Sequence, residues 1–83
     1  MGHFVEAVLA NNRREVEERI DRLVDEGCAD YCLVVKRFSV RSLDIGEFKL
    51  WVLKNAPDED PEELIEEAVR EGKEYIYFID CHH

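Results

Sequence analysis

The segment spanning residues 60–81 constrains the fold of this chain more than any other, because it reads as a helix with both end signals and a strand directly after it. Asp60 is suited to cap the first turn, and Pro61 fits the first helical position, where its missing N–H would be unpaired anyway. Gly72 supplies the left-handed residue that ends such a helix. The run that follows, 75–81, is rich in aromatic and β-branched residues and predicts a strand. A one-sided helix joined to a strand must pack on a sheet, so the chain is expected to belong to the α+β class.

A second helix is predicted between Asn12 and Gly27. Asn12 and Glu15 have the spacing of a capping box, in which Glu15 reaches back toward the start of the helix. Apolar residues then recur at helical spacing, and they are Val16, Ile20, Leu23 and Val24. Both predicted helices are therefore apolar on one side.

Three further strands are predicted from β-branched and aromatic content. Residues 31–40 and 47–53 read as a hairpin joined through 41–46. Residues 4–10 fit either a strand or the first part of a longer helix, and a strand is favoured because Asn11 and Asn12 interrupt the pattern.

The resulting order is βαββαβ, in a single α+β domain over residues 1–83. Two crossovers of the usual hand give a ferredoxin-like, two-layer sandwich. Its four-stranded antiparallel sheet has the order 4-1-3-2, and both helices lie on one face. The expected core consists of Val16, Ile20, Leu23, Phe48, Leu50, Leu64, Val69, Ile76 and Phe78.

Charge and cysteine content exclude several classes of function. The 83 residues include 11 Lys and Arg against 20 Asp and Glu, a formal net charge of −9. Nucleic acid and anionic membranes are disfavoured as partners, because both are bound through Lys and Arg. No apolar run is long enough for a membrane span, and the start of the chain lacks the order of a signal peptide. Three cysteines do not form a disulfide framework, so a cytoplasmic, reducing setting is expected.

Aromatic residues are expected on the open face of the predicted sheet. Sheet alternation predicts that Trp51, Tyr75, Tyr77 and Phe4 point away from the helices. A homodimer packed sheet to sheet would cover them. The alternative is that these side chains only pack across strands on a solvated surface.

Cysteine and histidine residues gather at one edge of the predicted sheet. Zn²⁺ coordination is one hypothesis for this set. Against it, the strands carrying Cys32 and Cys81 are opposite edges in the predicted order, about 14 Å apart. The candidate ligands are His3, Cys28, Cys32, Cys81 and His82.

A second hypothesis is a thiol-dependent hydrolase in which one of the cysteines is activated by a neighbouring histidine. The plainer alternatives are that Cys32 is an apolar core residue and that His82 and His83 are remnants of a tag. A disulfide between Cys28 and Cys32 is not expected if both lie in extended chain.

Residues 60–74, with their cap, charge bias and closing glycine, resemble the helices of computationally designed or redesigned ferredoxin-like proteins. Residues 12–27 carry the same resemblance in weaker form. The resemblance implies a scaffold with no natural enzymatic activity. Cys28, Cys32, Cys81 and Trp51 depart from idealised choices, which suggests a redesigned natural backbone or a deliberately placed site. The expected function is therefore a scaffold, with a metal- or partner-binding module as the alternative and a hydrolase third.

Overall fold

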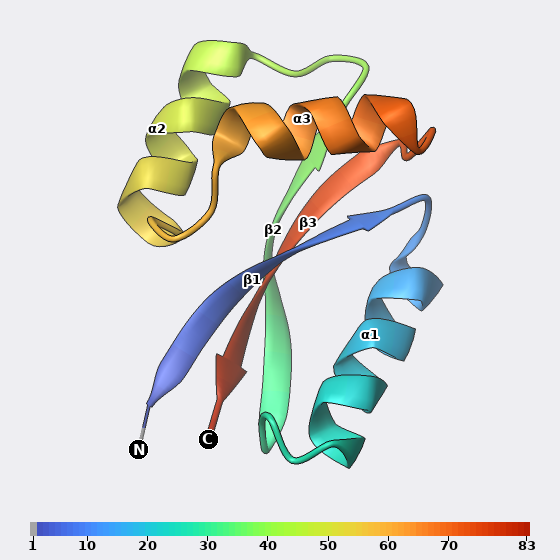
Figure 1. Cartoon of the computed structure of the whole chain (residues 1–83), viewed down its shortest axis with the longest axis vertical. Coiled ribbons are helices and arrows are strands. Elements are labelled where there is room, and N and C mark those ends of the chain that lie inside the picture. Colours follow the sequence, from blue (N-terminus) through green and yellow to red (C-terminus); the bar gives the residue numbers. More distant parts are fainter. Residues whose placement is uncertain (1) are drawn as a thin grey trace.

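The computed structural model describes residues 2–83, which contain three strands and three helices (Figure 1). The elements are β1 (His3–Ala10), α1 (Arg13–Asp25), β2 (Tyr31–Ser39), α2 (Ile45–Asn55), α3 (Pro61–Arg70) and β3 (Tyr75–His82).

The three strands form one sheet in the order β1-β3-β2. The last strand, β3, lies in the centre and runs antiparallel to both neighbours, so β1 and β2 are parallel to each other. The chain passes from β1 through α1 to β2 and returns much later to insert β3 between them. This arrangement is a split βαβ unit, and it brings the start of β1, the start of β2 and the end of β3 to one end of the sheet (Figure 1).

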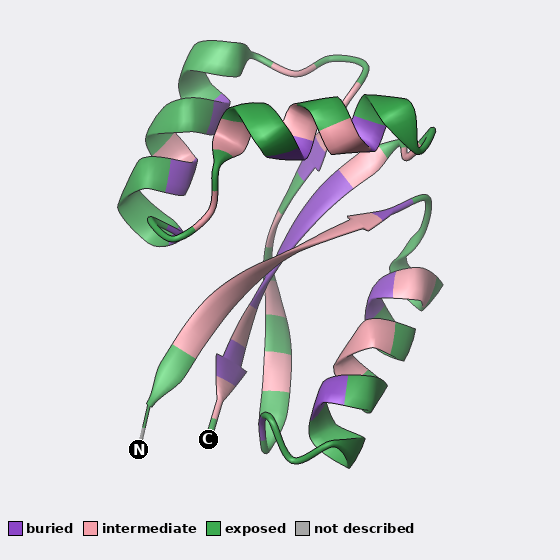
Figure 2. Ribbon diagram, in the orientation of Figure 1, coloured by how far each residue is buried: buried purple, intermediate pink, exposed green. Residues whose placement is uncertain are grey.

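Helices cover both faces of the sheet. Tyr77, Ile79 and Cys81 of β3 pack in a cluster with the apolar side of α1, while Ile76 and Phe78 pack with α2 and α3. Successive residues of a strand point to opposite faces, so a central strand between two helical layers is buried on both sides. Figure 2 shows this burial along β3, in contrast to the more exposed edge strands.

The predicted ferredoxin-like fold is wrong, because residues 47–53 form part of a helix rather than a strand. Phe48 and Val52 stand one helical turn apart and are both buried against β3 and α3. Asp44 caps this helix, with its Oδ1 accepting a hydrogen bond from the Glu47 N–H at 3.0 Å. The sheet therefore has three strands, its last strand is central rather than at an edge, and the helices are not confined to one face.

The signals predicted for the other two helices are confirmed. Asn12 Oδ1 accepts from the Glu15 N–H, and Asp60 Oδ1 accepts from the N–H groups of Glu62 and Glu63. The glycines after α1 and α3 have φ values of 77° and 67°, in the left-handed region. Most of the expected core is buried or partly buried, but Leu50 and Val69 are 69% and 65% exposed.

The aromatic residues predicted to share an open face do not lie together on one. Phe4, Tyr75 and Tyr77 belong to the cluster on the α1 side of the sheet. Trp51 lies on α2, with its ring 4.6 Å from the ring of Phe78 between the centroids. The predicted homodimer was inferred from a shared aromatic face that the structure does not contain. Homodimerisation stays a prediction.

Candidate functional site

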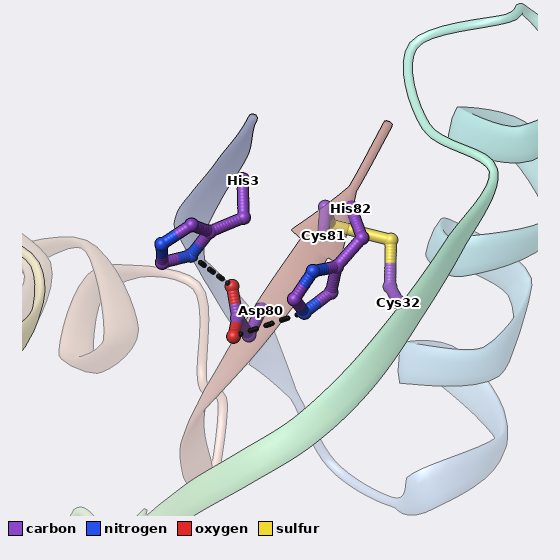
Figure 3. A network of polar contacts seen from close by, with 5 residues as sticks. All are labelled: His3, Cys32, Asp80, Cys81 and His82. Atoms are coloured by element: carbon purple, nitrogen blue, oxygen red, sulfur yellow. Dashed lines mark hydrogen bonds and ion pairs between the residues drawn. A yellow bond between two sulfur atoms is a disulfide. The ribbon is translucent and has the colours of Figure 1, made fainter. Parts of the chain in front are cut away.

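Two histidines from neighbouring strands share one carboxylate at the end of the sheet where the two termini lie (Figures 1 and 3). His3 Nδ1 is 2.9 Å from Asp80 Oδ1, and His82 Nε2 is 3.2 Å from Asp80 Oδ2. The register explains the contact, because His3 is directly opposite His82 in the β1–β3 ladder. Asp80 lies two residues before His82 on β3 and therefore points to the same face.

A row of three rings crosses the sheet at the same level. The rings of Tyr31 and His82 are stacked, with centroids 4.9 Å apart and planes 9° apart. The His82 ring is stacked in turn on the ring of His3, at 5.4 Å and 14°. Tyr31 is opposite His82 in the β2–β3 ladder, so each strand contributes one ring. The orientation of the His82 imidazole is thus set by a ring on each side and by the carboxylate of Asp80.

The cluster is accessible to solvent, because α2 and α3 cover the opposite end of this face (Figure 1). The His3 side chain is 64% exposed, while those of His82 and Asp80 are 33% and 23% exposed. A shallow pocket of about 260 Å³ adjoins the rings, lined by Gly2, His3, Asp30, Tyr31, His82 and His83. Ions and small solutes therefore have direct access to the imidazoles.

The cysteines lie apart from this cluster. Cys32 and Cys81 form a disulfide, and they are directly opposite each other on β2 and β3. Their separation across the sheet was predicted wrongly, because β3 is central and borders β2. Strand alternation places both sulfurs on the α1 face, opposite to the side chains of Asp80 and His82. Cys28, after α1, is free and exposed.

Of the five ligands predicted from the sequence, the structure brings only His3 and His82 together with a further donor, Asp80. Cys32 and Cys81 are bonded to each other and have no free thiolate to offer a metal or a substrate in this state. Within residues 2–83, no group of three or more His, Cys, Asp or Glu side chains is placed to hold a metal ion as the side chains stand.

Sequence reasoning missed Asp80 and Tyr31. A signal for Asp80 was present, since Asp80 and His82 are two residues apart on a predicted strand and must share a face. Tyr31 could not be assigned in the same way, because its place beside His82 depends on the pairing of β2 with β3.

Comparisons with protein-family models, with curated proteins and with solved structures gave no match. None of the helices within residues 2–83 has both the length and the apolar character that crossing a membrane requires. The site must therefore be interpreted from its own geometry.

Proposed function

We propose that this chain is a binding module for a divalent transition-metal ion such as Zn²⁺, with His3, Asp80 and His82 as its ligands. The observation that carries the proposal is the single carboxylate that contacts an imidazole on each side, from two adjacent strands. Imidazole nitrogen and carboxylate oxygen are donors that Zn²⁺ and related ions prefer.

The distances within the cluster are compatible with a shared ion. Tetrahedral coordination with bonds of 2.0–2.2 Å separates neighbouring ligand atoms by about 3.3 Å. The two N···O distances, 2.9 and 3.2 Å, are close to that separation. Coordination requires the rings to turn until both nitrogens face one point, and His3, which is largely exposed, has room to do so.

Two further features favour ion binding over conversion of an organic substrate. The net charge of −9 attracts cations to the whole molecule. The adjoining pocket, at about 260 Å³, lies below the roughly 300–1,000 Å³ typical of small-molecule sites. Asp30, which also lines this pocket, adds negative charge beside the imidazoles.

The test is a calorimetric titration of the oxidised protein with Zn²⁺, repeated on His3→Asn, Asp80→Asn and His82→Asn. Each substitution removes one ligand and is expected to weaken binding by at least about tenfold. His83→Asn is the matched control, because His83 is the neighbouring histidine and lines the same pocket, but its ring lies beside that of Phe4. Its affinity is expected to equal that of the unsubstituted protein.

Equal losses in His83→Asn and His82→Asn would contradict the assignment of ligands. Failure of the unsubstituted protein to bind Zn²⁺ would overturn the proposal, and the scaffold expected from the resemblance to designed proteins would then be the better account.

A further inference from the structure

We infer that the Cys32–Cys81 disulfide is a redox switch that sets the metal affinity of the His3–Asp80–His82 site. This inference rests on the proposed function and adds its regulation. The disulfide is not a ligand in this scheme. It acts through the alignment of β2 on β3.

The β2–β3 register places the disulfide between the residue pairs that carry the site. Tyr31 lies opposite His82 on one side of the Cys32–Cys81 pair, and Leu33 lies opposite Asp80 on the other. The backbone carbonyl of His82 also accepts a hydrogen bond from the Asp30 N–H at 2.7 Å. Figure 3 shows the yellow sulfur–sulfur bond joining the two strands beside His82. Both ligands contributed by β3 are thus next to the covalent link in the sequence.

Accessibility determines where a reductant can attack. Cys81 is fully buried in the cluster on the α1 face, while Cys32 is partly exposed on the edge strand. A thiolate of a small dithiol therefore bonds to Cys32 Sγ, the sulfur–sulfur bond breaks, and Cys81 Sγ leaves with the electron pair and takes up a proton. The second thiol of the reductant then loses its proton, and its thiolate attacks the reductant sulfur that is bonded to Cys32 Sγ. Cys32 Sγ leaves and takes up a proton, which restores the Cys32 thiol. Two electrons pass to the protein, and the reductant becomes its own disulfide.

Reduction leaves the end of β2 held to β3 by hydrogen bonds and packing alone. Strand ends are the part of a sheet that opens most readily, and Tyr31 is the first residue of β2. When Tyr31 leaves the stack, the His82 ring loses one of the contacts that orient it toward Asp80. The ligands are then less preorganised, and we expect metal affinity to fall by about tenfold, as for other groups that orient ligands.

Two measurements test the switch. The first compares Zn²⁺ affinity by calorimetry between Cys28→Ser, which keeps the disulfide, and Cys28→Ser/Cys32→Ala/Cys81→Ala, which has no thiol that could itself bind zinc. The second follows the ring proton signals of Tyr31 and His82 by NMR in the metal-free, unsubstituted protein before and after reduction with dithiothreitol. This NMR measurement uses the unsubstituted protein and therefore does not depend on whether the triple variant folds.

A tenfold loss of affinity in the triple variant, with ring signals that move toward unstacked values on reduction, is the expected result. Equal affinities with unchanged ring signals would overturn the switch while leaving the metal site intact. If neither variant nor the unsubstituted protein binds Zn²⁺ and the ring signals still move, the proposed function fails but the link between disulfide and ring stack stands. If the triple variant does not fold, the NMR measurement alone tests the switch. Ring proton signals that do not change on reduction would again overturn it.

Discussion

Glu59, in the connection between α2 and α3, is a carboxylate that the fold disfavours in its ionised form. Burial raises the pKa of its side chain, and the negative charges of Glu6, Glu67, Asp58 and Glu63 raise it further. Because the folded-state pKa is above its ordinary value, the stability associated with this group is full at low pH and is lost as the pH rises through the raised pKa. Glu59→Gln is expected to stabilise the protein by about 0.5 kcal/mol at pH 7 and to leave it unchanged at acidic pH.

Glu15 is the matched control for this titration, because its environment acts in the opposite direction. The backbone N–H of Asn11 donates to its Oε1 at 2.8 Å and lowers the pKa of the carboxyl, with a further contribution from Lys73. Its stabilising effect is present above the ordinary pKa and is lost as the pH falls through the lowered one. Glu15→Gln should therefore remove stability at neutral pH. Urea denaturation from pH 3 to pH 8 checks both variants, and effects of the same sign would contradict these assignments.

At the scale of elements, local signals identified α1 and α3 but not α2. The ends of α1 and α3 are marked by residues that act on their own backbone, namely Asn12, Asp60 and the two closing glycines. The α2 segment, by contrast, contains apolar residues that satisfy both a strand period and a helix period. Asp44 and Glu47 have the same spacing as the capping box of α1, and this is the local signal that marks the start of α2.

The order of the strands in the sheet was harder to predict from the sequence than the positions of the helices. Each strand other than residues 47–53 was predicted nearly in place, but their pairing depends on contacts between distant segments. The proximity of His3 and His82 was nevertheless anticipated, because the first and last strands are antiparallel neighbours in both the predicted and the observed sheet. The pairing of Cys32 with Cys81 was not anticipated. The predicted sheet contained an extra strand, residues 47–53, and its order placed the two cysteines at opposite edges, whereas β3 in fact pairs directly with β2.

Gly46 tests the helical state of α2. It lies in the first turn of the helix, without the positive φ of Gly27 and Gly72, and an added Cβ would meet Asp44 Oδ1 at an ordinary 3.5 Å. Gly46→Ala is therefore expected to stabilise the protein by about 0.5–1 kcal/mol, because alanine loses less backbone entropy on folding. Gly27→Ala, at a φ of 77°, should destabilise it. Thermal unfolding measures both, and a loss in Gly46→Ala similar to that in Gly27→Ala would indicate a turn instead of a helix.

For the molecule as a whole, the disulfide joins parts of the chain that lie 49 residues apart. The loop that it closes contains α2, α3 and most of β2 and β3, so it ties together all the elements on one face of the sheet. A domain of 83 residues buries a smaller fraction of its surface than larger domains do, and it depends correspondingly more on such links.

Removing the disulfide should therefore lower global stability. Loop-closure entropy for a loop of this length gives an expected loss of about 4 kcal/mol in Cys28→Ser/Cys32→Ala/Cys81→Ala relative to Cys28→Ser. Guanidinium denaturation of both variants, followed by the fluorescence of Trp51, measures the difference, because this ring packs against Phe78 in the core. The transition of the triple variant should move to lower denaturant as one cooperative step. Equal midpoints would show that the disulfide constrains only the ends of β2 and β3, since a cross-link that restricts the unfolded chain must shift the whole transition.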